Sequence, residues 1–391
     1  MVFRIKSSLT KFIRRKMMMK TIIREVLNKK DREIFIRLPY RLYQSDLNWV
    51  PPLIADQRQL FNPDKDPFFE HSTVAFFIAF QNEKPVGRIA AIKNNNHLSV
   101  YFDQTGFFGF FECINDESVA SALFEAAGNW LKQQGLKKMR GPANYSMNEE
   151  AGLLVDGFDS PPVVMMTYNP RYYQALIEKD RFTKKMDLYA YSIDNVHEIP
   201  RRLQEAVNLI NAGNHFSVRQ LNMRRLHEEI QAIKSIYNAA WSENWGAVPL
   251  THREIDKLQH ELVQIVRPEL CFIAEADGRA VGVSITIPDV NEVLIKMGGR
   301  LFPTGVLKYL WYRRKIKGVR VLIMGVLKEY RNLGIDLLFY YKTFENGLRL
   351  GYDHGEMSWI LENNIPMRNA LEKIPGTRIY KTYRIYEKSI S

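Results

Sequence analysis

Cysteine, long apolar runs and clustered metal ligands are all scarce in this 391-residue sequence. Its two cysteines, Cys113 and Cys271, are too few for a disulfide framework, so we expect free thiols in a reducing cytoplasm. No apolar run approaches the ~20 residues that a membrane-spanning helix requires. His71 and His97 have no further ligands at a recognisable spacing, so no metal site is predicted. The sequence also lacks a Gly-x-Ser-x-Gly motif, which argues against covalent catalysis.

The body of the chain has little excess positive charge. The total charge is +12, but the first thirty residues hold ten Lys and Arg against one Glu, a charge of +9, which leaves +3 for the rest. A near-neutral body does not provide the basic groove that nucleic acids require. Nucleic acid is therefore not an expected partner.

The tail, residues 1–19, places Ile5, Leu9, Phe12 and Ile13 at helical spacing among its cations. This pattern suits an amphipathic helix lying on an anionic surface, which would make the protein peripheral on the inner face of the membrane. A tail without a fold, or a true start at one of the methionines at 17–19, fits equally well. Both interpretations stay open.

Two halves of the chain share one pattern. Each begins with a strand–turn–strand segment, "FFIAFQNEKPVGRIAAIK" in the first half and "CFIAEADGRAVGVSITI" in the second. Each continues with a long amphipathic helix that stops at a glycine, Gly135 or Gly351, then a short strand and a helix that contains Glu-Lys. We therefore expect a duplicated α/β unit that joins near Tyr191–Arg202.

The turn Leu327–Gly334 joins the apolar strand "VRVLIMGV" to the second long helix. The N–H groups at the start of a helix have no partners within it and favour an anion, and glycine permits a close approach. Arg331 adds a cation. An ordinary strand–helix connection is the alternative reading of the same residues.

This turn resembles the coenzyme-A loop of the GNAT acyltransferases, in the form Arg331-Asn-Leu-Gly334-Ile-Asp336. The segment "ENNIPMRNALEK" resembles the second block of the family, with Asn364 in the Asn position. The segments "NWVPPL", "GFFGFFE", "YNPRYY" and "WSENWGAVP" resemble a group of bacterial tandem-GNAT proteins, some of which are associated with N-acylation of sphingoid bases.

The resemblance implies an α/β protein with two tandem GNAT-like units, each a mixed, mostly antiparallel twisted sheet flanked by helices. After the tail, the first unit would be 20–195, with a degenerate coenzyme-A loop, and the second 196–391, with the functional loop. Acyl-CoA would be a co-substrate, with no cofactor bound permanently. The oligomeric state is left open. The residues expected to hold acyl-CoA are Gly325, Val326, Arg331, Asn332, Gly334, Ile335 and Asn364.

The sequence departs from the family in three places. Asp336 puts a carboxylate where Gly or Ala is usual. The tyrosine that often protonates the departing thiolate is replaced by Leu371 in the second half and by Ile177 in the first. The first-half loop has no glycine and carries Asp116 and Glu117 at the start of its helix, where they disfavour an anion.

Three carboxylates are candidates for the catalytic base: Glu243, Asp289 and Glu362. The long polar loop Gly141–Pro162 and the tryptophan-rich segment Ala239–Thr251 could bind the acceptor, although turn chemistry explains both as well. The basic and aromatic stretch Arg300–Arg320 suits a lipid interface, a phosphate-rich ligand or a solvated helix.

The predicted function is acyl transfer from acyl-CoA to an amine, with a long acyl chain and a lipid amine such as a sphingoid base as one option. Three alternatives remain: an acetyltransferase for a small soluble amine, a non-catalytic membrane-associated protein that keeps the fold, and an RNA-dependent transferase.

Overall fold

The computed structural model describes residues 20–211, 216–241 and 244–391. The predicted membrane-binding tail lies outside them. The strands are β1 (Ile22–Glu25), β2 (Ser72–Gln81), β3 (Lys84–Asn94), β4 (Thr105–Cys113), β5 (Lys138–Gly141), β6 (Ala143–Asn144), β7 (Glu150–Ala151), β8 (Leu153–Asp156), β9 (Thr183–Ile193), β10 (Phe216–Gln220), β11 (Cys271–Ala276), β12 (Arg279–Pro288), β13 (Gly318–Val326), β14 (His354–Leu361) and β15 (Arg378–Ser389). The α-helices are α2 (Lys29–Leu42), α3 (Ile54–Leu60), α4 (Asn95–Tyr101), α5 (Glu117–Gln133), α6 (Tyr172–Lys179), α7 (Arg201–Asn211), α8 (Leu226–Trp241), α9 (His252–Val263), α10 (Asn291–Met297), α11 (Gly305–Tyr312), α12 (Ile335–Leu350) and α13 (Ile365–Glu372).

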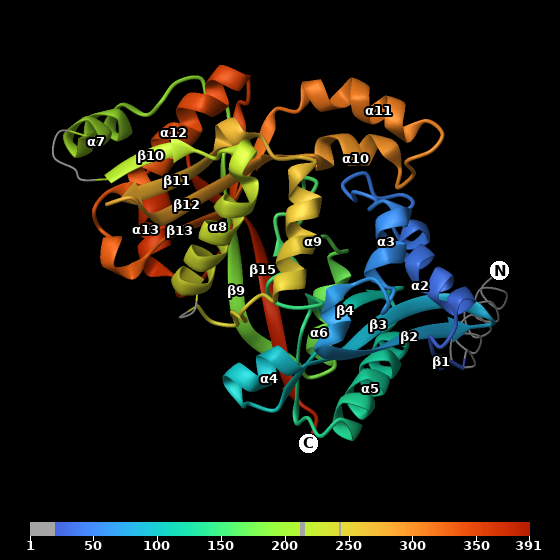
Figure 1. Cartoon of the computed structure of the whole chain (residues 1–391). Helices are drawn as coiled ribbons and strands as arrows, with labels where there is room; N and C mark the ends of the chain where they lie inside the picture. The colour runs from blue at the N-terminus through green and yellow to red at the C-terminus, as the bar shows by residue number, and fades with distance from the viewer. Residues whose placement is uncertain (1–19, 212–215, 242–243) are drawn as a thin grey trace, which may run out of the picture.

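One sheet runs through both halves of the described chain (Figure 1). Its order is β1-β2-β3-β4-β5-β15-β9-β14-β13-β12-β11-β10, and β8 pairs with β15. From each outer edge, antiparallel strands lead inward to one parallel pair, β4 with β5 or β13 with β14. The predicted tandem architecture of mostly antiparallel sheets flanked by helices is confirmed.

The two predicted hairpins form where the turn residues demand them. Asn82 and Glu83 have φ of 47° and 62° between β2 and β3, and Asp277 and Gly278 have φ of 51° and 75° between β11 and β12. Two successive positive φ values match the right-handed twist of the flanking strands. The hairpins therefore fix the register on which each half is built.

The last strand of each half pairs with strands of the other. β9 ends the first half but lies between β15 and β14, and β15 ends the chain but pairs with β5 and β8. Two equivalent hydrogen bonds accompany this exchange: Tyr191 Oη donates to Glu372 Oε1 and Tyr386 Oη to Glu178 Oε1, both at 2.9 Å. The unit limits 20–195 and 196–391 stay a prediction, and each unit shares its final strand with its neighbour.

A long helix covers one face of the sheet in each half. α5 buries Val119, Leu123 and Phe124, and α12 buries Ile335 and Phe339, as their helical apolar spacing requires. In the second half, α8 contacts β12 and β13 and packs Trp241 against β13. α10 and α11 pack together as an insertion between β12 and β13, beside α3 (Figure 1).

Candidate functional site

Strands β13 and β14 separate in the middle of the second half. Their parallel pairing runs from Gly318 with His354 to Val321 with Met357 and then stops, although β13 continues to Val326. Beyond Val321, β13 pairs only with β12 among the described strands. The backbone groups of this part of β13 that face β14 therefore lack sheet partners and can bind amide or carbonyl groups of a ligand. Gly325 and Val326, both predicted to contact acyl-CoA, lie here.

The start of α12 carries no side-chain cap. Gly334 precedes the helix with φ of 86°, a conformation that favours glycine, and no side chain caps the helix. The first N–H groups of this 16-residue helix thus have no capping acceptor. Arg331 and Asn332 are exposed beside them. The Arg331 guanidinium donates to the carbonyl groups of Val326 and Ala240, each at 3.3 Å, which ties the turn to the ends of β13 and α8.

Helix α7 covers the outer side of this turn. A Cβ atom on Gly334 would lie 2.4 Å from Cδ1 of Ile210, so a side chain here would collide with α7 as well as strain the backbone. Ile335 is buried in the core. It can contribute to an anion site only through its backbone N–H.

The side chain of Trp241 packs against the separated part of β13. A Cβ atom on Gly325 would lie 2.3 Å from Cζ3 of Trp241, so glycine permits the indole to approach the strand closely. Trp241 stacks on Tyr237 with ring centroids 4.7 Å apart. Trp245, the other tryptophan of the segment Ala239–Thr251, lies elsewhere, under the Arg140 guanidinium at 5.3 Å.

Buried polar groups gather along the paired part of β13 and β14. The backbone of Val164 connects two of them: its N–H donates to Asp289 Oδ1 at 2.8 Å, and its carbonyl accepts from Arg320 at 2.6 Å. The Asn291 N–H also donates to Asp289 Oδ1, at 3.1 Å. Val164 belongs to the first half, so both halves build this site.

Strands β14 and β15 supply the remaining members. Arg320 donates to the Ser358 hydroxyl at 3.0 Å and lies in register with Glu356, while Tyr380 donates to Glu356. One oxygen of Glu356 and the Tyr383 hydroxyl are buried without a hydrogen-bond partner among the described residues. Unpaired buried polar atoms cost stability, which suggests a ligand-binding role for this group. We call these residues the polar cluster: Asp289, Arg320, Glu356, Ser358, Tyr380 and Tyr383.

The electrostatics of the polar cluster favour proton transfer. Burial, with smaller contributions from the charges of Glu292 and Glu356, raises the pKa of Asp289 to about 7 against the opposing effect of the two backbone hydrogen bonds. Burial also raises the pKa of Glu356, although Arg320 opposes the rise. Burial raises the pKa of Tyr380 and Tyr383 as well, so both phenols stay protonated. A carboxyl group whose pKa lies near 7, beside protonated phenols, can exchange protons at physiological pH.

In the first half, groups of the protein itself fill the space that corresponds to the gap between β13 and β14. Asn144 lies between the diverging β4 and β5, and its Oδ1 accepts from the Phe110 N–H at 2.7 Å. Tyr145 fills the adjoining core and stacks on Phe68. The start of α5 is capped by the Asp116 carboxylate, which accepts from Ser118 and Val119. The strand amide of Phe110 and the start of α5 are thus occupied by groups of the protein itself.

The three predicted bases have separate positions. Asp289 belongs to the polar cluster. Glu362 lies at the end of β14, where it accepts from the Asp187 N–H at 3.1 Å and pairs with Lys184 at 2.6 Å. Glu243 lies outside the described residues. Asn364 caps α13 through a bond from the Met367 N–H at 3.3 Å.

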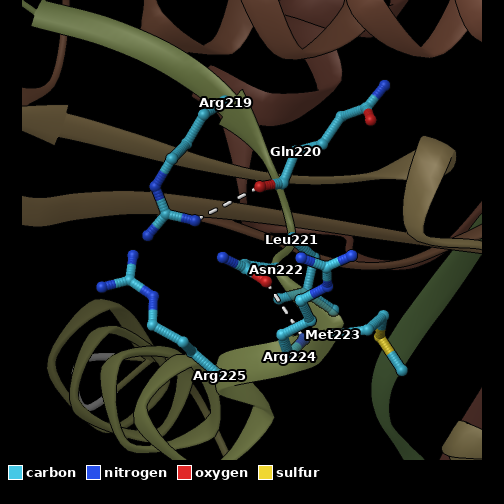
Figure 2. A pocket seen from close by; sticks show the side chains of 7 residues that line it. All are labelled: Arg219, Gln220, Leu221, Asn222, Met223, Arg224 and Arg225. Carbon is cyan, nitrogen blue, oxygen red and sulfur yellow. Dashed lines mark hydrogen bonds between the residues drawn. The ribbon is translucent and has the colours of Figure 1, made fainter.

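A separate hollow of about 520 Å³ opens at the edge of the sheet, lined by the consecutive residues Arg219–Arg225 (Figure 2). Arg219 is neutralised by Glu229 and Glu275, each at 2.8 Å. None of the predicted site residues lines this hollow. We assign it no role.

Among the described residues, no group of His, Cys, Asp and Glu could hold a metal ion. Within the same ranges, no helix combines the length and the apolar composition needed to cross a bilayer.

No model of a known protein family matches the sequence. The sequence is 39% identical over 364 residues to the bacterial ceramide synthase of Caulobacter vibrioides, covering 91% of this chain and 94% of that protein. It is 37% identical over 377 residues to protein YghO of Escherichia coli, with 94% and 95% covered. The chain belongs to this family of tandem-GNAT acyltransferases.

Solved structures show the same fold. A tandem GNAT protein from the clavulanic acid biosynthesis pathway aligns with a TM-score of 0.55 at 10% identity, covering 95% of this chain and 99% of that one. A GCN5-related N-acetyltransferase from Sphaerobacter thermophilus aligns with a TM-score of 0.53 at 12% identity, covering 95% and 96%. The predicted tandem-GNAT resemblance is confirmed.

The sequence pattern alone did not identify most of the polar cluster in this tandem GNAT. The charge pattern groups Arg320 with the basic stretch Arg300–Arg320, but its side chain is buried, and Glu356, Tyr380 and Tyr383 belong to no motif. One signal was available: Arg320 and Glu356 are single charges inside otherwise apolar strands. The two tyrosines carried no such signal, because β15 reaches the site only through the strand exchange.

Proposed function

We propose that this protein is an acyl-CoA-dependent N-acyltransferase that acylates a lipid amine such as a sphingoid base. The name of the Caulobacter relative supports the lipid amine. The position of Asp289 carries the chemical part of the proposal. It is a buried carboxyl with a pKa of about 7 that both halves hold beside the paired start of β13, where the Asp289 N–H donates to the Gly318 carbonyl.

In this proposal, the second half binds acyl-CoA. The free N–H groups at the start of α12, with Arg331 and Asn332, face the pyrophosphate. The pantetheine extends along Leu322–Val326, where β13 has no partner on the β14 side. A β13 N–H at the Leu322 end of this stretch, nearest the polar cluster, then donates to the thioester carbonyl and stabilises the developing oxyanion.

The amine is activated by the polar cluster. Asp289 accepts a proton from the ammonium, and the free amine attacks the thioester carbon, so that a C–N bond forms and the C–S bond breaks. The thiolate of coenzyme A takes a proton from Tyr380 or Tyr383, which stand in for the tyrosine that Leu371 replaces. The second proton that the attacking nitrogen loses restores this phenol. The net reaction yields an amide and the free thiol of coenzyme A.

The acceptor class can be tested directly with purified protein. Acyl-CoA donors of short and long chain would be combined with a sphingoid base or with a small soluble amine, and mass spectrometry would quantify the N-acyl product. We expect amide only with the sphingoid base, matched mole for mole by released coenzyme A. Turnover with the small amine alone would refute the lipid acceptor but would still support N-acyltransferase activity.

A further inference from the structure

The insertion between β12 and β13 exposes a group of large apolar side chains. Leu307, Leu310 and Trp311 lie on one face of α11 and are 68%, 48% and 67% exposed. In the preceding loop, Leu301 and Phe302 are 37% and 74% exposed. Five of the sixteen exposed large hydrophobic side chains in the described residues therefore lie within eleven positions. We call these five residues the apolar face.

This exposure does not arise from a loosely attached helix. Tyr309 and Tyr312 on the opposite side of α11 pack into the core of the second half. The base of the insertion is tied to α3, because the Ile54 N–H donates to the Gly299 carbonyl at 3.1 Å. The helix that carries most of the apolar face, α11, thus has a fixed support, and it lies over α10 (Figure 1).

Cations surround the apolar face, and no acidic residue occurs between Arg300 and Arg320. Among the described residues, Arg300, Arg313, Arg314 and Lys315 are exposed and form no ion pair with an acidic side chain. Lys315 lies 5.3 Å above the Trp311 ring. Arg320 turns inward, and Lys308 and Lys317 donate to the carbonyl groups of Lys296 and Gly351.

From this arrangement we propose that the apolar face and its cations dock the protein on an anionic phospholipid bilayer. Apolar and aromatic side chains enter the headgroup boundary, while the surrounding Arg and Lys pair with lipid phosphates. A protein partner of the same shape would need a compensating acidic surface around an apolar centre. A bilayer with anionic lipids supplies both at once.

The residues of the docking surface are neighbours in sequence of residues in the proposed site. Asp289 directly follows β12 and precedes α10, and Arg320 lies at the start of β13, where the insertion returns to the sheet. Docking would therefore bring a lipid acceptor close to the polar cluster. This consequence rests on the proposed function, whereas bilayer binding does not.

Fluorescence of the full chain with brominated lipids tests the proposal at a defined side chain. Vesicles would contain phosphatidylcholine alone or phosphatidylcholine with phosphatidylglycerol. We expect brominated anionic vesicles to quench the emission of wild type, and Trp311→Phe to remove most of that quenching. Binding to the vesicles without any quenching that depends on Trp311 would place the contact elsewhere, for example in residues 1–19, and would overturn the proposal.

Cosedimentation with the same vesicles tests the charges. Replacing Arg313, Arg314 and Lys315 together by Gln should lower partitioning roughly a hundredfold, at about fivefold for each cation. The matched control replaces Lys65, Lys132 and Lys137 by Gln, which removes the same charge from exposed sites elsewhere. Equal loss in both variants would mean that only net charge matters and would contradict a docking face.

Circular dichroism of each variant must match wild type, because only folded protein is informative. The oligomeric state offers a further check. If wild type forms a dimer that the pair Leu307→Ser and Trp311→Ser converts to a monomer, the face is a self-association surface and the proposal fails.

Discussion

The Val164 N–H of the first half donates to the Asp289 carboxylate of the second half over 2.8 Å. This bond explains why a half with a closed coenzyme-A region would persist in the protein. The first half positions the proposed base, and the Val164 carbonyl holds Arg320 beside it. The two halves therefore form one site.

The number of acyl-CoA molecules per chain should be one. In the first half, Asn144 occupies the Phe110 N–H and Asp116 caps α5, so that half has no comparable place for pantetheine and pyrophosphate. Isothermal titration calorimetry with a nonhydrolysable acyl-CoA analogue measures this number. A stoichiometry of two would show that the first half also binds acyl-CoA.

Asp336 should weaken acyl-CoA binding. Its carboxylate lies in the first turn of α12, close to where the pyrophosphate is expected, and like charges repel there. We expect Asp336→Asn to improve affinity by about 1 kcal/mol. Asp116→Asn, at the start of the equivalent helix α5, is the matched control and should leave affinity unchanged. Calorimetry at low ionic strength compares the two, and weaker binding by Asp336→Asn would refute the placement of the pyrophosphate.

Stability should depend on pH through Asp289. Its pKa of about 7 in the folded protein lies above the ordinary aspartate pKa of 3.8, so the folded state favours the protonated carboxyl. The stability that this preference contributes is present at low pH and is lost as pH rises through about 7. Asp289→Asn removes the dependence, so the variant should gain stability relative to wild type between about pH 5 and about pH 8, by up to a few kcal/mol.

Urea unfolding at both pH values measures this effect. Glu149, whose pKa burial also raises to about 7, changes stability in the same direction but is present in both proteins. A stability difference between variant and wild type that is the same at both pH values would contradict the raised pKa of Asp289.

The strand exchange should make the two halves unfold together. Ile177→Ala creates a cavity in the first half and should cost roughly 2–5 kcal/mol. Because β15 and β9 each pair with strands of the other half, hydrogen exchange in β12 and β13 should accelerate along with that in β3 and β4. Acceleration confined to the first half would mean that the halves are energetically independent.

Local patterns in the sequence predicted much of this fold. Apolar alternation and the Asn82 and Asp277 turns predicted the hairpins, and helical spacing with a terminal glycine predicted α5 and α12. The pairing of β15 with β5 could not be predicted, because a strand has the same local pattern whichever neighbour it joins.

Only part of the site could be predicted from the sequence, again because long-range pairing leaves no local pattern. The turn at Arg331 and Gly334 is local and was identified from its motif, and Asp289 was one candidate among three. Glu356 and Tyr380 meet Arg320 only after the sheet assembles. Burial and the raised pKa of Asp289 are likewise tertiary properties, so the sequence offered no basis for choosing between Asp289 and Glu362.

The most direct test of the central claim is the rate of amide formation from acyl-CoA and a sphingoid base by wild type and by Asp289→Asn. We expect wild-type kcat/KM to rise with pH with an apparent pKa near 7, and the variant to lose roughly 10²–10⁴-fold in rate while its Kd for acyl-CoA is unchanged. If Asp289→Asn keeps the wild-type rate and pH profile, Asp289 is not the base and the proposed site is wrong.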